Sequence, residues 1–411
     1  MAEWSCSGLQ SRLRRFDSGF SLQTRKDISM KMIPYGIQDI DDEDIKSVID
    51  VLKSDFITQG PLTRVFEEKI LNYVGSKYCV SLNSATSALH AACAALGLGE
   101  CDYLWTSPIS FVASANCGIY CGAKIDFIDI NLDDYSISID NLKEKLEQAK
   151  ENNKLPKIII PVHLGGYCSN LIELKKLSEE YGFKIIEDAS HCIGGSYKDN
   201  KIGDCKYSDA TVFSFHPVKI ITTGEGGAVT TNDKKLYELI DKFKGHGLVR
   251  GIENYEEKID QEWYYEQQSL GYNYRITDIQ LSLGLSQLKK LDNFIETRRD
   301  IAKHYFSEIR NHDIILPSYE DEKSSSYHLF IIRKLTNRNE FFSFLRENNI
   351  FCQLHYIPIY RHPFYKKIGY DPNNFPNSES YYDQALSIPI HQKLSESQIN
   401  YIVETINNYD Q

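Results

Sequence analysis

Short apolar runs alternate with stretches of helical periodicity between residue 33 and about residue 235. The apolar runs span residues 78–82, 125–130, 157–163, 184–186, 210–215 and 227–231, and the helix-like stretches span residues 84–96, 142–150 and 171–181. Several runs are apolar on both faces, which indicates strands covered by helices on both sides. The pattern predicts an α/β fold with a mostly parallel central sheet, in which ligands bind beyond the carboxyl ends of the strands.

The rest of the chain predicts a second, smaller domain. A long helical pattern over residues 275–310 is expected to connect the two domains, and strand and helix patterns return over residues 327–332, 340–348 and 395–408. A chain of 411 residues is long enough to form two cores. We expect a large domain over residues 33–290 and a small C-terminal α/β domain over residues 291–411.

Two segments do not follow these patterns. Residues 1–32 are polar and contain arginine, without the apolar stretch of a secretory signal, so a disordered extension or a leader is expected. A transit peptide is the alternative, although Asp17 and Asp27 depart from its acid-poor composition. Residues 251–268 are polar and aromatic, which predicts a surface excursion that acts as a lid or contacts a partner.

Charge and cysteine usage narrow the class of protein. The formal net charge of −11 argues against a nucleic-acid partner, which would require a basic face. The sequence contains no run of about 18 apolar residues, so no membrane span is expected. The ten cysteines are scattered without a CxxC pair, which favours structural thiols over a metal site. Free thiols favour a reducing compartment, the cytoplasm.

One lysine, Lys219, stands in a glycine-rich loop directly after an apolar strand. Lysine is seldom buried without a reason, and a buried amine with a lowered pKa can form a Schiff base with an aldehyde. A phosphate-binding lysine and an ordinary surface loop are the alternatives. The glycines do not follow the spacing of a P-loop. Lys219 is therefore a candidate for covalent catalysis with an aldehyde cofactor.

An acidic pair, Glu187-Asp188, ends another strand, and His191 follows three residues later. Pyridoxal 5′-phosphate (PLP) needs a carboxylate beside its ring nitrogen to act as an electron sink, and Asp188 is placed for this contact. The alternative is a helix-capping aspartate, and a lone histidine is more often a core residue. The pairing with Lys219 favours the cofactor interpretation for both residues.

The segment 83–89 opens a predicted helix with small hydroxyl residues. The free N–H groups and the positive dipole end of such a helix can hold a phosphate. Ordinary capping by Ser84 is the alternative.

Taken together, these runs resemble the DegT/DnrJ/EryC1/StrS family of sugar aminotransferases, from about residue 33 to the end of the chain. The resemblance is most specific from Ser214 to Gly227, which includes His216, Lys219 and Thr223, and the runs 187–191 and 271–278 are also typical. It implies the fold type I of PLP-dependent transferases, which is aspartate aminotransferase-like, and a homodimer with shared active sites.

The resemblance implies roles for single residues. Lys219 would form the internal aldimine and carry protons, Asp188 would pair with the ring nitrogen, and His191 would lie near the 3′ oxygen. The further cofactor contacts that it implies are Phe111 stacked on the ring, Ala85, Thr86 and Ser214 at the phosphate, and Asn273 at the phosphate of the partner subunit's cofactor.

The substrate is implied by a narrower likeness. The runs 33–36, 354–358 and 360–365 are similar to the branch of the family that acts in pseudaminic acid biosynthesis. That branch transfers an amino group from L-glutamate to a UDP-linked 4-keto-6-deoxy-2-acetamido sugar. Tyr35, His355 and Tyr356 are the expected substrate contacts. Arg250, Lys244 and Arg275 are candidates for binding the diphosphate.

Three other classes remain open. A PLP-dependent sugar dehydratase would have histidine in place of Lys219. A regulator built on the same fold would usually add a DNA-binding domain, which the net charge does not support. A PLP-dependent lyase or decarboxylase would bind an α-carboxylate with an arginine, for which Arg333, Arg338 and Arg346 are candidates.

Overall fold

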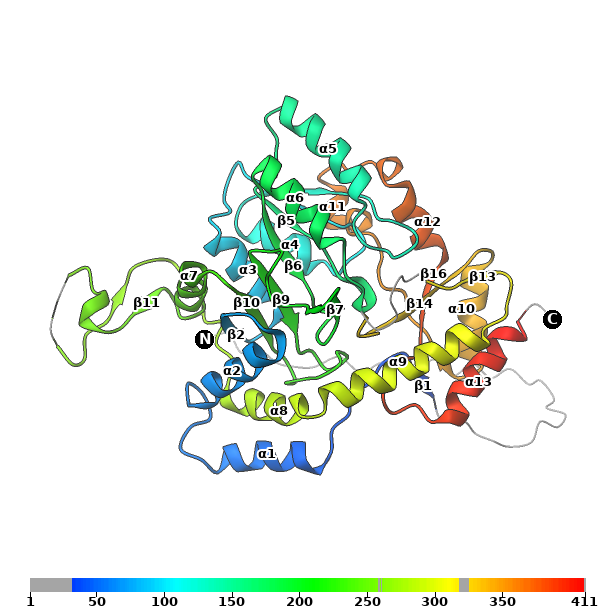
Figure 1. Cartoon of the computed structure of the whole chain (residues 1–411), viewed down its shortest axis with the longest axis horizontal. Coiled ribbons are helices and arrows are strands. Elements are labelled where there is room, and N and C mark those ends of the chain that lie inside the picture. Colours follow the sequence, from blue (N-terminus) through cyan, green and yellow to red (C-terminus); the bar gives the residue numbers. More distant parts are fainter. Residues whose placement is uncertain (1–31, 258, 260, 318–324, 410–411) are drawn as a thin grey trace, which may run out of the picture. The chain divides into compact units, whose positions relative to one another are not determined.

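The computed structural model describes residues 32–257, 259, 261–317 and 325–409, and within them a seven-stranded sheet forms the centre of the fold (Figure 1). In spatial order its strands are β2 (Tyr78–Leu82), β10 (Gly227–Thr231), β9 (Ala210–Ser214), β6 (Lys184–Asp188), β5 (Ile158–Ile160), β3 (Tyr103–Thr106) and β4 (Lys124–Phe127). Strand β10 is antiparallel to both neighbours and the other pairs are parallel. The predicted α/β class and mostly parallel sheet are confirmed. The short strand β3 was not predicted.

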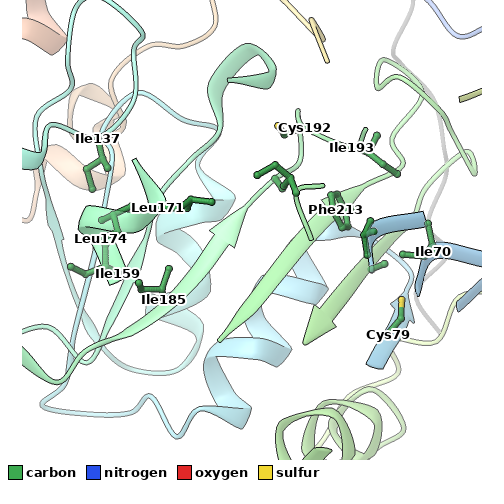
Figure 2. Close-up of a cluster of buried hydrophobic side chains, with 14 of the residues drawn as sticks. Ile70, Cys79, Ile137, Ile159, Leu171, Leu174, Ile185, Cys192, Ile193 and Phe213 are labelled. Atoms are coloured by element: carbon green, nitrogen blue, oxygen red, sulfur yellow. The ribbon is translucent and has the colours of Figure 1, made fainter. Parts of the chain in front are cut away.

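Helices cover both faces of the sheet, as the two-faced apolar strands require. The covering helices are α2 (Leu62–Val74), α3 (Ala85–Ala95), α4 (Ala113–Tyr120), α5 (Ile139–Glu151), α6 (Leu171–Tyr181) and α7 (Lys234–Lys244). Strand β5 shows the alternation: Ile159 packs with α5 and α6, while Ile158 and Ile160 pack in a second cluster with α3 and α4. Figure 2 shows Ile159 beside Leu171 and Leu174 in the first cluster.

The predicted helix over residues 275–310 is two helices, α8 (Asp278–Leu288) and α9 (Leu291–Glu308). Lys289 and Lys290 keep right-handed backbone angles, so the interruption is a kink rather than a loop. The Lys290 ammonium lies 2.6 Å from the Asp44 carboxylate of α1 (Asp42–Leu52). The prediction of one continuous helix is wrong. The apolar period continues across the kink, so the sequence pattern does not reveal it.

A second group of elements follows α9. It contains an antiparallel sheet of β13 (Ile314–Ile315), β14 (Phe330–Lys334) and β16 (Ala385–Ile388), and the helices α10 (Arg338–Glu347), α11 (Pro363–Lys366), α12 (Pro376–Gln384) and α13 (Glu396–Asn407). Strand β1 (Ile33–Pro34) pairs with β15 (Ile350–Phe351), so the start of the described chain joins this group. The domain boundary at residues 290 and 291 stays a prediction, and the predicted extension 1–32 lies outside the described residues except for Met32.

The described residues of the aromatic segment 251–268 belong to a hairpin whose two strands are β11 (Leu248–Val249) and β12 (Glu266–Gln267), and this hairpin extends away from the central sheet (Figure 1). Residues 258 and 260 lie outside the described residues. Trp263 is 74% exposed in this hairpin, so the predicted surface excursion is confirmed, while its role as a lid or partner contact stays a prediction. Strands β7 (Ser196–Tyr197) and β8 (Asn200–Lys201) pair with each other in another hairpin.

The described part of the chain has no helix long and apolar enough to cross a membrane. Its nine cysteines are free thiols, and its described residues include no cluster of three or more potential metal ligands.

Candidate active site

A cavity of about 410 Å³ lies at the carboxyl ends of β6 and β9. Ten of the eleven residues that the sequence predicts for cofactor and substrate line this one cavity: Tyr35, Ala85, Thr86, Phe111, Asp188, His191, Ser214, Lys219, His355 and Tyr356. The side chains therefore converge where the rule for α/β sheets places a ligand.

Lys219 reaches this cavity from the connection between β9 and β10. Its neighbours Ile220 and Ile221 are buried in the core, and the Lys219 N–H donates to the His216 carbonyl at 2.9 Å. Burial lowers the pKa of Lys219 to about 8, against the opposite effect of the Asp188 carboxylate. The neutral amine, which is the nucleophilic form, is thus accessible near neutral pH.

Asp188 is held by the sheet and by two donors. Its backbone N–H donates to the Pro161 carbonyl at 2.9 Å, because β6 lies between β5 and β9. The Ser114 hydroxyl donates to Asp188 Oδ2 at 2.6 Å, and the Ser190 N–H donates to Oδ1 at 3.1 Å. A buried carboxylate is therefore presented to the same cavity as the Lys219 amine.

The N-terminus of α3 closes another side of the cavity. Ser84 caps this helix and accepts from the Ser87 N–H, while the N–H groups of Ala85 and Thr86 precede the first intrahelical bond, from Ala88 to Ser84. Strand β10 approaches this end at Gly227, where a Cβ would lie 2.6 Å from Ala85 N. Only glycine permits this approach, which brings Ser214, the partner of Gly227 in β9, close to the helix end.

His191 bonds to two residues that are far apart in the sequence, Gly165 and Tyr356. Its Nδ1 accepts the Gly165 N–H at 3.2 Å, so in the neutral ring the proton is on Nε2, which donates to the Tyr356 hydroxyl at 3.2 Å. Burial and the neighbouring Lys219 and His355 hold the pKa of His191 well below its ordinary value. The Tyr356 hydroxyl, whose pKa burial raises, keeps its own proton to donate to a ligand.

Two aromatic rings face the cavity, the exposed ring of Phe111 and the partly buried ring of Tyr35. Phe111 is 58% exposed although it lines the cavity, and its ring centroid is 6.2 Å from that of Tyr356. Tyr35 packs on His355 with centroids 4.9 Å apart. An exposed phenyl ring beside a cavity is suited to stacking on a flat ligand.

Asn273 is the predicted site residue that does not line the cavity. Its side chain is exposed, and its carbonyl accepts from Asn83 Nδ2 at 3.4 Å, next to the start of α3. Its contact with a partner subunit's cofactor stays a prediction.

The basic residues considered for other ligands lie outside the cavity lining. Lys244 is paired with Asp241 at 2.8 Å, and the Arg250 guanidinium lies over the Tyr265 ring. Arg333 and Arg338 bond to groups of the segment 382–384. No arginine among the described residues lines the cavity.

The sequence analysis missed several residues of the site. Ser110 and His328 line the cavity, and Ser114 bonds to Asp188 from outside the lining. The His328 ring centroid lies 4.4 Å from that of His191, a contact between residues 137 positions apart by their numbers. Ser110 and Ser114 flank Phe111 at a helical spacing, which is the one signal that pointed to them.

This arrangement fits PLP on chemical grounds. A lysine of lowered pKa suits the aldehyde, a buried carboxylate suits the pyridine nitrogen, an exposed phenyl ring suits the ring face, and a helix N-terminus suits the phosphate.

Comparisons with known proteins show which proteins this chain is similar to. The model of the DegT/DnrJ/EryC1/StrS aminotransferase family matches residues 38–407. The UDP-4-amino-4,6-dideoxy-N-acetyl-beta-L-altrosamine transaminase of Campylobacter jejuni is 38% identical over 91% of this chain and 96% of its own. The Helicobacter pylori structure titled "PseC, aminotransferase involved in the biosynthesis of pseudoaminic acid" superposes with a TM-score of 0.83 at 32% identity, covering 92% of this chain and 98% of that one. The putative sugar aminotransferase Spr1654 of Streptococcus pneumoniae, solved in PLP and PMP forms, gives a TM-score of 0.82 at 28% identity, and the PLP-form comparison covers 92% of this chain and 98% of that one.

Proposed function

Because this chain belongs to the DegT/DnrJ/EryC1/StrS aminotransferase family, whose members are PLP-dependent, we propose that it aminates a UDP-linked 4-keto-6-deoxy-2-acetamido sugar at C4. L-glutamate is the proposed amino donor, and pseudaminic acid biosynthesis is the proposed pathway. The single observation that carries the proposal is the likeness, over 91% of the chain, to a transaminase named for such a sugar.

The residues of the cavity have complementary roles in this proposal. When bound, PLP supplies an electron sink that stabilises negative charge at the carbon undergoing proton transfer. Lys219 would hold the cofactor covalently, and its amine, once displaced by the amino donor, would remove and return the proton. Asp188 keeps the ring nitrogen protonated, and Phe111 and the start of α3 fix the ring and the phosphate.

The proposed substrate contacts are Tyr35, His355 and Tyr356, which line the same cavity. Tyr356, with its hydroxyl proton directed away from His191, donates to an oxygen of the ligand. Tyr35 and His355 shape the side of the cavity where the sugar would enter. The neutral state of His355, whose pKa burial lowers to about 3, suits a hydrogen-bonding rather than an ionic contact with an uncharged sugar ring.

A homodimer belongs to the same proposal, with Asn273 of each subunit completing the other subunit's phosphate site. The exposed position of Asn273 beside the start of α3 supports this role. A cytoplasmic location is proposed as well, supported by the free thiols in the described part of the chain.

The test is amination of the UDP-linked keto-sugar by the purified enzyme with L-glutamate, followed by mass spectrometry of the sugar product. Lys219→Ala is expected to abolish turnover and the cofactor's visible absorption, while Lys234→Ala, a change at an exposed lysine of α7, leaves both intact. A product without new nitrogen would overturn the proposal. Conversion of a different nucleotide-linked keto-sugar at a much higher kcat/KM would replace the proposed sugar.

The dehydratase alternative makes a different prediction for the same assay. A dehydratase would release water and leave the sugar without an amino group. Lys219 argues against this alternative, because its amine is the nucleophile that amine exchange requires, whereas a dehydratase would have histidine at this position.

A further inference from the structure

We infer that Ser114 positions the Asp188 carboxylate for the cofactor, and that Ser110 positions the Ser114 hydroxyl in turn. The inference rests on the proposed contact of Asp188 with the ring nitrogen, and adds two positioning residues to it. Two short bonds carry it: Ser114 Oγ lies 2.6 Å from Asp188 Oδ2 and 2.7 Å from Ser110 Oγ.

The direction of each bond follows from the donors available. A carboxylate only accepts, so the single proton of the Ser114 hydroxyl goes to Asp188. The Phe111 carbonyl, 3.3 Å from Ser114 Oγ, is a neutral and more distant competitor for that proton. In the contact between the two serines the proton must therefore come from Ser110. The chain of bonds runs from Ser110, which lines the cavity, through Ser114 to Asp188.

Two donors on different oxygens fix the plane of the carboxylate. Ser114 holds Oδ2 and the Ser190 N–H holds Oδ1, so rotation about the Cβ–Cγ bond of Asp188 would break both bonds. The main chain of Asp188 cannot follow such a rotation, since its strand is paired on both sides. The carboxylate is thus preorganised toward the cavity before any ligand binds.

Helix α4 is seated closely enough to hold Ser114 in place. One turn after Ser114, a Cβ on Gly118 would lie 2.5 Å from Ile125 Cδ1 and 3.1 Å from Leu104 Cδ1. The absence of a side chain at Gly118 lets α4 lie against β3 and β4 at van der Waals distance. Ser114 itself is fully buried, so water does not replace its hydroxyl if it is removed.

The test measures cofactor binding rather than turnover alone. Ser114→Ala is expected to weaken binding of PLP to the apoenzyme by about 10-fold to 100-fold, the range for a hydrogen bond to a charged group. The variant should also lower kcat more than it changes the KM of the sugar, because Ser114 acts through the cofactor. Ser110→Ala should act in the same direction and more weakly, and Ser114→Thr, which keeps the hydroxyl, should restore binding.

Ser378→Ala is the matched control. The Ser378 hydroxyl is also fully buried and donates to a buried aspartate, Asp129, at 2.5 Å, and neither residue lines the cavity. It should lower stability and leave PLP affinity unchanged. Equal effects of Ser114→Ala and Ser378→Ala on stability and on PLP affinity would reduce Ser114 to a structural residue and overturn the inference.

Asp188→Ala separates this inference from the proposed function. If Asp188→Ala loses PLP while Ser114→Ala binds it as tightly as the parent enzyme, the inference fails and the role of Asp188 stands. If Asp188→Ala keeps normal PLP affinity and turnover, the proposed contact with the ring nitrogen fails, and the inference fails with it.

Discussion

The approach of β10 to the start of α3 makes Gly227→Ala the sharpest perturbation of the phosphate end of the cavity. An added Cβ would lie 2.6 Å from three backbone atoms, Ala85 N, Ser84 C and Ser84 O, whereas ordinary contact begins at 3.4 Å. Side-chain rotation cannot relieve a clash with backbone. Strand β10 cannot retreat either, because Gly227 is paired with Leu82 on one side and Ser214 on the other. The first turn of α3 must therefore move by most of an ångström.

The cost of that movement has two parts. Overpacking of a closely packed site typically destabilises a protein by about 1–3 kcal/mol. If the N–H groups of Ala85 and Thr86 hold the phosphate, the loss of one hydrogen bond to this charged group should weaken cofactor binding by about 10-fold to 100-fold.

Equilibrium binding of PLP to the apoenzyme and urea unfolding measure these two effects separately. Gly99→Ala is the control, since a Cβ at Gly99 meets no atom within 4 Å. A Gly227→Ala enzyme that binds PLP as tightly as the Gly99→Ala enzyme would refute the assignment of the phosphate to the start of α3.

Three further predictions concern single residues. Burial lowers the pKa of Lys219 from 10.5 to about 8, so between these two pH values the unfolded chain binds more protons than the folded chain. The free energy of unfolding of the apoenzyme, measured with urea, should therefore rise with pH over this range. Lys219→Met should flatten the rise. Equal changes of unfolding free energy with pH in the parent enzyme and in Lys219→Met would contradict the burial of the Lys219 amine. Glu187→Ala should cost about 3–5 kcal/mol in urea unfolding, because the buried Glu187 carboxylate accepts from His163 and Ser208; a loss below about 1 kcal/mol would refute this. Phe111→Ala should change stability by less than about 0.5 kcal/mol, as its ring is exposed, yet weaken PLP binding in the same titration; unchanged binding would remove Phe111 from the site.

The local pattern of the chain was enough to predict six of the seven strands of the central sheet. Strands such as β5, apolar on both faces, leave no polar side for water, so helices must cover both faces of the sheet. The same pattern places Asp188 and Ser214 at strand ends, and the carboxyl ends of parallel strands share one edge. The convergence of ten predicted residues on one cavity follows from this rule together with the family resemblance.

The features that escaped prediction depend on contacts between distant parts of the chain. The kink at Lys289 and Lys290 was hidden because the apolar period continues through it. Strand β1 pairs with β15, more than 300 residues away by their numbers, and two-residue strands carry no period at all.

Sequence alone therefore determined most of the strands and the edge of the sheet at which the predicted site residues lie, since periodicity and turn chemistry act over a few neighbouring residues. Only the tertiary structure decided how those residues are held. The Ser114 hydroxyl meets Asp188 across 74 positions, and Tyr356 meets His191 across 165. Such contacts are set by how helices and loops pack on the sheet, and no local propensity encodes the resulting orientation of a carboxylate or the direction of a hydroxyl proton.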